Sequence, residues 1–301
     1  MLRDRWNCSS AGVEQHTRRA LVRRSLVVNN SKKHASKLKA LVITAPGINC
    51  DAELCEGFAL AGCTVESELL ARLSRDPSRI DAFDLIGLPG GFSYGDDIAA
   101  GRIMAALIRQ SIYPALAHAV ERGCPILAPC NGFQIAAQAG LLPGPEVGTE
   151  WPAEPAISTI ALAPNETGRF NNIWVGMEVP VETKCVWTRN LEFSRATGLI
   201  PCAHGEGRFV ADDETIEQLE ANGQIAMRYS AADHFNGSRN RIAGICDSTG
   251  LVFGLMPHPE RYLHWTQHPR WTRLTEAERS VVPPGLQMFQ NAVEHALQTI
   301  A

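Results

Sequence analysis

The sequence predicts an α/β fold, with a mostly parallel central sheet that carries helices on both faces, and a smaller, partly antiparallel sheet. In the first half of the domain, short apolar segments alternate with helical patterns at the spacing of βαβ units. These segments are apolar throughout, which is typical of strands covered on both faces. In the second half, short strand-like segments follow one another with less helix between them. We therefore expect the second half to extend the same domain with partly antiparallel strands.

The elements of the first half are bounded by clear start and stop residues. Ala40–Thr44 is an apolar run ended by Pro46 and Gly47, so we expect a strand there. Asn49 and Asp51 can cap the helix that follows. The predicted elements are then this helix to about Ala61, strands over Thr64–Leu70 and Asp84–Leu88, a long helix from about Asp97 to Arg122, and a short buried strand over Pro125–Pro129.

The second half contains shorter strand patterns and one clear helix. The predicted strands are Ile157–Leu162, Ile173–Glu182, Gln224–Arg228, Ile242–Cys246 and Val252–Met256. A final amphipathic helix over about Leu286–Leu297 follows the turn residues Pro283 and Pro284. The segment Trp265–Val282 is polar and contains Trp and Arg, and its pattern favours no particular element.

Composition limits the classes of protein that this chain can represent. Of its 301 residues, 45% are hydrophobic and 20% are charged, which is typical of a globular protein. No run approaches the roughly 18 consecutive apolar residues that a membrane span needs. The nine cysteines are odd in number and form no C-x-x-C pair, so they predict neither a disulfide framework nor a metal site. A reducing cytoplasm is the simplest location for such a chain.

The charge of the chain is unevenly distributed. Residues 1–39 hold ten Lys and Arg against two Asp and Glu, a net charge of +8, so the remainder carries −12. Residues 1–38 lack a steady apolar period, and we expect a basic, disordered tail whose deletion changes neither folding nor activity. An organelle transit peptide or a start codon placed too far upstream would give the same pattern. The acidic domain over residues 39–301 is a poor candidate for nucleic-acid binding.

Cys130 stands where a short strand turns sharply into a helix. The pattern Cys130-Asn131-Gly132 after the apolar strand is that of a nucleophile elbow, in which Gly132 gives room where a Cβ would meet the strand. A thiol at the N-terminus of a helix lies near free N–H groups and the positive end of the dipole, which favours the thiolate. The alternative is a buried structural cysteine, which is the more common state of a lone Cys. The downstream motifs favour the nucleophile.

A histidine and a glutamate follow the last predicted strand. His258 lies between two prolines, and Glu260 comes two residues later. In an extended segment residues i and i+2 point the same way, so Glu260 can reach the far side of the imidazole. The pattern predicts a triad in which Cys130 attacks, His258 moves the proton and Glu260 holds the tautomer. A strand-end histidine capped by its neighbour is the competing interpretation.

Attack by a thiolate on a carbonyl produces an oxyanion, which needs N–H donors already in place. The turn at Gly90 and Gly91 offers backbone amides without side chains, and Asn131 offers the amide that follows the nucleophile. Taken alone, such a turn is more often an ordinary loop. The loop around His204 and Gly205 has small residues flanking a polar pair, which suits a backbone that approaches a ligand.

Together these motifs resemble the class I (triad) glutamine amidotransferases, and within them the glutaminase subunits of phosphoribosylformylglycinamidine synthase, known as PurQ. The blocks that carry the resemblance are Gly47–Asp51, Pro89–Asp96, Cys130–Gln134, Ala203–Phe209 and Met256–Arg261. They occur in order from Leu41 to the C-terminus, so the resemblance covers all of the chain except the tail. Gly-Phe-Ser-Tyr-Gly-Asp and His-Gly-Glu-Gly are the most specific of them.

The resemblance implies the flavodoxin-like fold of this class and hydrolysis of L-glutamine through a γ-glutamyl thioester on Cys130. It also implies that Gly91 and Asn131 form the oxyanion hole, and that Gln134, His204 and Gly205 help to hold glutamine. Replacement of Cys50, in the helix-capping segment, is expected to leave hydrolysis intact.

The resemblance further implies that the ammonia passes to an ATP-using synthetase subunit, PurL, in a complex that also contains the small subunit PurS. The synthetase would convert formylglycinamide ribonucleotide to its amidine in purine biosynthesis. We expect no cofactor on this chain, with ATP and Mg²⁺ held by the synthetase, and indeed the sequence has no G-x-x-x-x-G-K-[ST] loop.

The sequence departs from the family pattern at one point, and three alternative functions remain open from the sequence alone. Ala128 and Pro129 precede the nucleophile where the family usually has Gly-Val or Gly-Ile, so one backbone N–H is missing at the strand end. The alternatives are the glutaminase of another class I amidotransferase, a catalytically silent docking subunit, and a Cys–His hydrolase of peptides or small amides. Glutaminase assays and labelling of Cys130 separate them.

Overall fold

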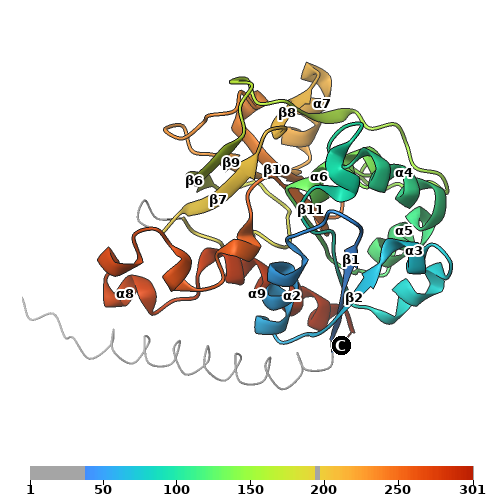
Figure 1. Cartoon of the computed structure of the whole chain (residues 1–301), viewed down its shortest axis with the longest axis horizontal. Helices are drawn as coiled ribbons and strands as arrows, with labels where there is room; N and C mark the ends of the chain where they lie inside the picture. The colour runs from blue at the N-terminus through green and yellow to red at the C-terminus, as the bar shows by residue number, and fades with distance from the viewer. Residues whose placement is uncertain (1–37, 194–196, 301) are drawn as a thin grey trace, which may run out of the picture.

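The computed structural model describes residues 38–193 and 197–300 (Figure 1). Of the expected basic tail only Leu38 falls inside this range, and the rest of that prediction lies outside the described residues. Leu38 is buried and its carbonyl accepts the N–H of Thr64 at 2.9 Å, so the folded domain begins no later than this residue. Among the described residues, none of the helices combines the length and apolar character that crossing a membrane requires.

In the described part of the chain, nine strands form one sheet in the order β2-β1-β3-β4-β11-β10-β9-β6-β7. The strands are β1 (Lys39–Thr44), β2 (Thr64–Leu69), β3 (Leu85–Gly87), β4 (Ile126–Pro129), β6 (Asn171–Glu178), β7 (Leu199–His204), β9 (Ile225–Tyr229), β10 (Ile242–Cys246) and β11 (Val252–Leu255). β5 (Ile160–Ala163) and β8 (Arg208–Ala211) form a separate antiparallel pair.

The central sheet has two halves with different strand directions. The five strands from β2 to β11 are parallel, and β10, β9, β6 and β7 then alternate in direction. β1, β3, β4 and β11 are buried along nearly their whole length, whereas the edge strand β2 has only one buried residue, Glu68. The fold class is therefore confirmed, and the antiparallel strands extend the central sheet in addition to forming the small second sheet.

Helices cover both faces of the parallel half (Figure 1). The helices are α2 (Asp51–Leu60), α3 (Leu70–Leu73), α4 (Arg102–Ser111), α5 (Tyr113–Glu121), α6 (Asn131–Ala139), α7 (Asp213–Ala221), α8 (Glu276–Arg279) and α9 (Pro284–Ile300). α2 and α9 lie together on one face, where the rings of Phe58 and Phe289 meet edge to face at 5.2 Å. α4, α5 and α6 lie on the other, and Phe133 of α6 packs against Gly254 of β11.

The long helix expected from about Asp97 to Arg122 is wrong in its extent. The segment before Arg102 is irregular, and Gly101 precedes α4 with a φ of 73°. α4 then ends at Ser111, and α5 begins at Tyr113 with Pro114 in its first turn. Proline cannot donate an N–H and its ring clashes with the carbonyl four residues earlier, so a continuous helix cannot pass this point.

Elements of the second half that were not predicted from the pattern include β7, β8, α7 and α8. The segment Trp265–Val282 contains two short 3₁₀ turns, Trp265–Gln267 and Trp271–Arg273, before α8. It covers Tyr262 with an aromatic cluster, in which the Trp265 ring lies 5.9 Å from that of Tyr262.

The topology brings distant motifs to one edge of the sheet. Because parallel strands end on the same side, the segments that follow β1, β3, β4 and β11 meet there. These segments contain Gly47, Gly91, Cys130 and His258 in turn. The edge therefore gathers four of the five motifs identified in the sequence.

Candidate active site

Cys130 occupies a strained turn between β4 and α6. Its φ of 52° and ψ of −111° lie outside the regions that ordinary residues favour, and strain of this kind is common at functional sites. Its N–H is fixed by the carbonyl of Leu255 on β11 at 2.7 Å. A Cβ at Gly132 would lie 2.0 Å from the Leu88 carbonyl oxygen, so only glycine lets the helix start this close to β3. The thiol is buried at the N-terminus of the helix.

His258 and Glu260 form a buried pair beside this thiol. The His258 Nδ1 and Glu260 Oε1 atoms are 2.6 Å apart, and the two side chains are 2% and 0% exposed. Burial opposes a charge on the imidazole, but the carboxylate of Glu260 and the nearby thiol of Cys130 act the other way and raise the pKa of His258 well above its ordinary value. An imidazole held in this way can accept and keep a proton.

The other ring nitrogen of His258 faces two thiols. Cys130 and Cys50 both lie within electrostatic reach of the imidazole. Within residues 38–193 and 197–300, Nε2 of His258 makes no hydrogen bond of ordinary geometry. The Cys130 thiol lies 3.7 Å from the carbonyl oxygen of Ala203. A thiol, an imidazole and a carboxylate are thus brought together as the sequence predicted.

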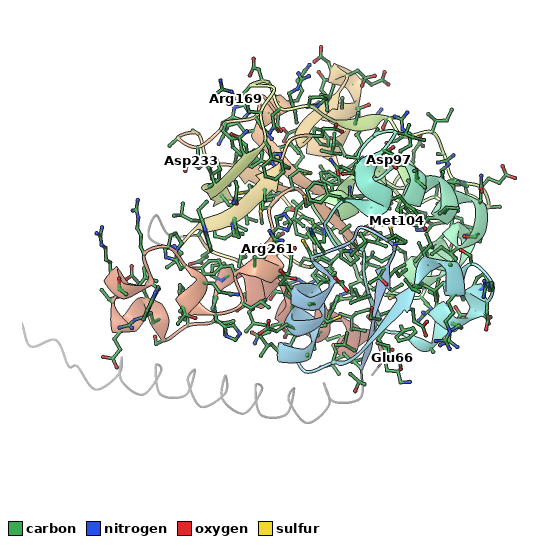
Figure 2. The ribbon with its side chains drawn as sticks, viewed as in Figure 1. Glu66, Asp97, Met104, Arg169, Asp233 and Arg261 are labelled. Atoms are coloured by element: carbon green, nitrogen blue, oxygen red, sulfur yellow. The ribbon has the colours of Figure 1, made fainter. Side chains whose placement is uncertain are left out.

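Cys50 and Arg261 belong to this site, and sequence reasoning did not include them. Arg261 donates from Nη2 to the Cys50 sulfur at 3.0 Å and forms an ion pair with Glu53 on α2 at 3.7 Å. Figure 2 shows Arg261 close to the blue ribbon of α2. Both residues could have been identified from the sequence, because each lies in one of the motifs shared with the family. Cys50→Ala is therefore no neutral control, and its retained activity stays a prediction.

Cys50, His258 and Glu260 place their ligand atoms within 4.8 Å of one another, a spacing that can hold a metal ion. The local charge opposes this use. The guanidinium of Arg261 contacts the Cys50 sulfur, and a cation placed there would meet a fixed positive charge. The hydrogen bond that Glu260 Oε1 accepts from His258 Nδ1 also matches a catalytic pair.

The proposed oxyanion donors belong to the turn that follows β3 and to the elbow itself. Gly91 has a φ of 135°, and a Cβ there would lie 2.7 Å from the amide nitrogen of Asn49, so the position requires glycine. The Gly90 carbonyl accepts the N–H of Cys50 at 3.3 Å. Because a trans peptide points its C=O and N–H in opposite directions, the Gly91 N–H points away from Cys50. Asn131 supplies the amide directly after the nucleophile.

A chain of side-chain hydrogen bonds holds the walls of the site together. Asn131 donates to Asp96 Oδ1 at 3.2 Å and to Gln134 Oε1 at 3.0 Å. Gln134 in turn donates to the carbonyl of Glu206. Both groups of the Gln134 amide are therefore engaged with protein atoms, although the residue does line the cavity. Its geometry suits a residue that fixes the Glu206 loop, and its predicted role in holding glutamine stays a prediction.

His204 and Gly205 lie at the end of β7, in the cavity wall. His204 is buried, and its Nδ1 atom is 3.1 Å from the Asn165 side-chain oxygen. Burial and the nearby His258 lower the pKa of His204 to about 4. This imidazole is therefore neutral near pH 7, in contrast to His258.

These residues surround a cavity of about 450 Å³, within the range of small-molecule sites. Gly91, Cys130, Gln134, His204, Gly205 and His258 all line it, together with Asp96, Glu206 and Arg261. Glu260 lies behind His258, and Asn131 behind the elbow. The cavity therefore combines a thiol nucleophile, a proton carrier and charged groups of both signs.

The comparisons agree with this geometry. Residues 37–296 match the family model of the CobB/CobQ-like glutamine amidotransferase domain. A PurQ subunit of phosphoribosylformylglycinamidine synthase from Dehalococcoides mccartyi is 36% identical, covering 87% of this chain and 99% of its own length. One from Corynebacterium jeikeium is 42% identical, covering 73% and 86%. The chain belongs to the PurQ family of glutamine amidotransferases.

A solved structure supports the same placement within the amidotransferases. PurLQS from Thermotoga maritima contains a chain with a TM-score of 0.62 and 32% identity, covering 85% of this chain and 98% of that one. The PurQ relatives favour this branch over other class I amidotransferases. The five motif blocks of the PurQ resemblance all contribute to one site here, since Cys50, Gly91, Cys130, His204 and His258 line the same cavity.

Proposed function

We propose that this chain is the glutaminase subunit of a phosphoribosylformylglycinamidine synthase and that Cys130, His258 and Glu260 are its catalytic triad. The observation that carries the proposal is the buried His258–Glu260 pair at 2.6 Å, placed beside a thiol on a strained elbow. This is the nucleophile–base–orienting group arrangement of covalent acyl transfer. The PurQ relatives identify the acyl group as that of glutamine.

In the first half-reaction, Cys130 gives its thiol proton to His258, and its sulfur attacks the side-chain amide carbon of glutamine, so that the amide oxygen becomes an oxyanion. The N–H groups of Gly91 and Asn131 are the proposed donors to it. The tetrahedral intermediate then expels the amide nitrogen, which takes a proton from His258 and leaves as ammonia. A γ-glutamyl thioester remains on Cys130.

In the second half-reaction, water attacks the thioester carbon while His258 accepts a proton from it. The carbon–sulfur bond then breaks, glutamate leaves, and His258 returns its proton to the sulfur, which restores the thiol. Glu260 keeps the imidazole oriented in both halves and stabilises its charged form. No redox group or metal enters this balance, because each step is a proton transfer or an acyl transfer.

The ammonia requires an acceptor. We propose that the chain assembles with a synthetase subunit of the PurL type and a PurS subunit, as in the complex named PurLQS. That partner would hold ATP and Mg²⁺ and form the amidine of formylglycinamide ribonucleotide. The free cysteines in the described chain suit a reducing cytoplasm, which we propose as the site of action.

Replacing Cys130 tests this function. Cys130→Ala should abolish glutamine-dependent amidine formation by the assembled enzyme, yet leave synthesis from free ammonium intact, because the synthetase retains its own site. Cys55→Ala, a half-buried thiol on α2 outside the cavity, is the matched control and should retain full glutaminase activity. Glutamate release and amidine formation are measured in parallel. Full glutaminase activity in Cys130→Ala would overturn the assignment of the nucleophile, and an inactive wild-type chain in the complex would indicate a silent docking subunit.

A further inference from the structure

Asn131 has a side chain that the proposed mechanism does not use. The mechanism needs only the backbone N–H of this residue, yet the side chain is buried and both of its polar atoms are engaged. Its Oδ1 accepts the N–H of Ser93 at 3.3 Å, and its Nδ2 donates to Asp96 Oδ1 at 3.2 Å and to Gln134 Oε1 at 3.0 Å. Ser93 and Asp96 belong to the segment that follows Gly91. The side chain therefore ties the elbow to the turn that carries the other proposed oxyanion donor.

The chemistry of the partners fixes which way the Asn131 amide is turned. The backbone N–H of Ser93 can only donate, so the end of the amide that faces it is the oxygen. The other end is then the NH₂ group, which has two hydrogens. The carboxylate of Asp96, which can only accept, takes one of them, and the side-chain oxygen of Gln134 takes the other. A reversed amide would oppose two donors at Ser93 and two acceptors at Asp96.

The backbone of the elbow needs support of this kind. Cys130 has a φ of 52° and a ψ of −111°, and strained geometry persists only where the surroundings over-determine it. The Cys130 carbonyl accepts the N–H groups of Phe133 and Gln134, at 2.9 and 3.3 Å, so it points along α6. Because a trans peptide points its C=O and N–H in opposite directions, the Asn131 N–H points out of the N-terminus of the helix. Rotation of this one peptide would turn the proposed donor away from an oxyanion.

Asp96 is itself held in the position that this contact requires. It has a φ of 51°, in the left-handed region, which aspartate tolerates better than most residues. Its Oδ1 atom accepts the N–H of Gly101 at 3.1 Å as well as the Asn131 amide. Gly101 directly precedes α4, and a Cβ added there would lie 2.9 Å from the Ile135 side chain of α6. One carboxylate oxygen therefore joins the start of α4 to the start of α6.

We propose that Asp96 is a positioning residue for the oxyanion hole: by accepting the Nδ2–H of Asn131, it holds the elbow and the turn after β3 at one separation, so that the N–H groups of Gly91 and Asn131 converge on the same oxygen. Gly91 follows β3 and Asn131 follows β4, so no single segment sets the distance between the two donors. This inference rests on the proposed function, because the oxyanion arises from the carbonyl that Cys130 attacks. It gives Asp96 and the Asn131 side chain a role that no motif assigned.

The first test compares three variants in the assembled enzyme. Asp96→Ala removes the acceptor, and kcat for glutamine hydrolysis should fall about tenfold to a hundredfold, up to the loss of one oxyanion donor, while KM changes much less. Both half-reactions pass through an oxyanion, so kcat falls whichever of them is slower. Asp96→Asn keeps an oxygen that can accept from Asn131 and should restore most of kcat. Asp97→Ala, the same kind of substitution at the exposed next residue, should leave both constants unchanged.

The second test asks whether Asp96 acts through Asn131. In a double-mutant cycle, Asp96→Ala should lower kcat in the native chain but change it little in Asn131→Ala, whose backbone N–H remains. Independent, multiplicative losses would overturn the proposal.

An exchanged pair decides the same question where the alanine variants do not fold. Asn131→Asp alone places two carboxylates against each other, whereas Asn131→Asp with Asp96→Asn restores a donor opposite a carboxylate. The exchanged pair should therefore have a higher kcat than Asn131→Asp alone. Equal kcat values in these two proteins would contradict a direct contact that supports catalysis.

The reactivity of the thiol separates positioning from general damage to the site. Alkylation of Cys130 by iodoacetamide forms no oxyanion, so its rate in Asp96→Ala should equal that of the native chain once the Cys130→Ala background is subtracted. Acylation by p-nitrophenyl acetate does form an oxyanion, and it should slow in parallel with kcat. An iodoacetamide rate that changes as much as kcat would indicate a displaced thiol and would overturn the proposal.

The outcomes distinguish this proposal from the proposed function. A native chain that releases no glutamate in the complex, but is acylated by p-nitrophenyl acetate faster than Asp96→Ala, would keep the positioning role and remove the glutaminase function. A native chain that hydrolyses glutamine no faster than Asp96→Ala would keep the function and remove the positioning role. A raised KM with an unchanged kcat would place Asp96 at the substrate, and would also overturn the proposal.

Discussion

At the scale of single residues, two histidines in one cavity are given opposite properties by their neighbours. His258 contacts a carboxylate and has a raised pKa, whereas His204 contacts the neutral amide of Asn165 and has a lowered one. Both are buried, so desolvation acts against the charged form of each. At His258 the Glu260 carboxylate and the Cys130 thiol outweigh this desolvation, whereas at His204 burial and the nearby His258 both oppose the charge.

The lowered pKa of His204 predicts how stability depends on pH. The folded pKa of about 4 lies below the ordinary value of 6.5, so the unfolded chain binds the proton more readily in this window. Stability is fully present above pH 6.5 and is lost as pH falls toward 4, by about 3 kcal/mol for this residue. His204→Gln should remove that part of the acid sensitivity. Urea unfolding of both proteins at pH 7 and pH 4.5 measures the difference, and identical pH dependence would contradict it.

The three residues of the proposed triad could be singled out from sequence because their signal is local. Cys130 is read from the turn around it, and His258 with Glu260 from a separation of two residues. Asn165 could not be found in this way. It meets His204 across 39 positions, from a loop with no periodicity, and only folding brings the two together. Arg261 and Cys50 are 211 positions apart, and the same limit applies to their contact.

At the scale of elements, the elbow depends on how closely α6 starts against β3. The contact is between backbone atoms, since the Cα of Gly132 faces the Leu88 carbonyl. The sequence indicated this close approach through Gly132, which lies two residues after Cys130. It did not indicate β7, because Pro201 interrupts the strand pattern. Proline is tolerated there because β7 is the edge strand of the sheet.

Gly132→Ala should therefore be strongly destabilising, although alanine is normally better than glycine in a helix. The new Cβ would lie 2.0 Å from a carbonyl oxygen, and neither backbone can move freely, because β3 and β4 are both buried. We expect a loss of about 3 kcal/mol or more in the free energy of unfolding, at the upper end of overpacking effects.

Gly168→Ala is the control for Gly132→Ala. This glycine has a φ of 64°, and in the described part of the chain no atom lies within 4 Å of the place that an added Cβ would take. Only backbone strain of about 1 kcal/mol is therefore expected. Denaturant unfolding measures both variants. A Gly132→Ala protein as stable as Gly168→Ala would contradict the close approach of the elbow to β3.

α7 was not predicted, although its sequence contains residues that mark the start of a helix. Its N-cap, Asp212, accepts the N–H of Thr215 at 2.8 Å, and acidic residues fill the first turn. The break between α4 and α5 was readable in the same way from Pro114. The bounds of β5 and β6 were less accessible, because half-exposed strands in this half alternate weakly between apolar and polar residues.

At the scale of the whole molecule, a sheet that is parallel on one side and antiparallel on the other joins two sets of functional residues. The parallel half provides the proposed nucleophile, its proposed triad partners and the proposed oxyanion donors. The antiparallel half provides β7, whose end carries His204. β11 and β10 join the halves. The alternation of strands and helices predicted the elements of the first half well. For the second half, it was the partly antiparallel class of structure that was predicted rather than the individual elements.

Without its synthetase, the isolated chain is expected to hydrolyse glutamine slowly. The Gly90–Gly91 peptide is held by one hydrogen bond from Cys50 at 3.3 Å, and glycines make its rotation sterically easy. A missing oxyanion donor costs about 2.7–4 kcal/mol of barrier, or roughly a hundredfold in rate. Addition of the synthetase with its ribonucleotide and nucleotide should therefore raise kcat far more than it changes KM.

Glutamate release by the chain alone and in the complex measures this effect. The Cys130→Ala chain in the same complex gives the background rate. Equal kcat values in the two states would contradict a donor completed by assembly. A change confined to KM would instead point to the loop at His204.

The position of β11 has a consequence for synthesis on the ribosome. This strand is close to the C-terminus in sequence, yet it lies between β4 and β10 in the middle of the sheet. Until residue 255 has emerged, β4 has one open edge, and Cys130 lacks both the Leu255 carbonyl that fixes its amide and the histidine that follows. An open edge of this kind is a site for mispairing. The open edge of β4 therefore needs protection while the chain is being synthesised. The proposed active site is complete only after β11 has paired between β4 and β10.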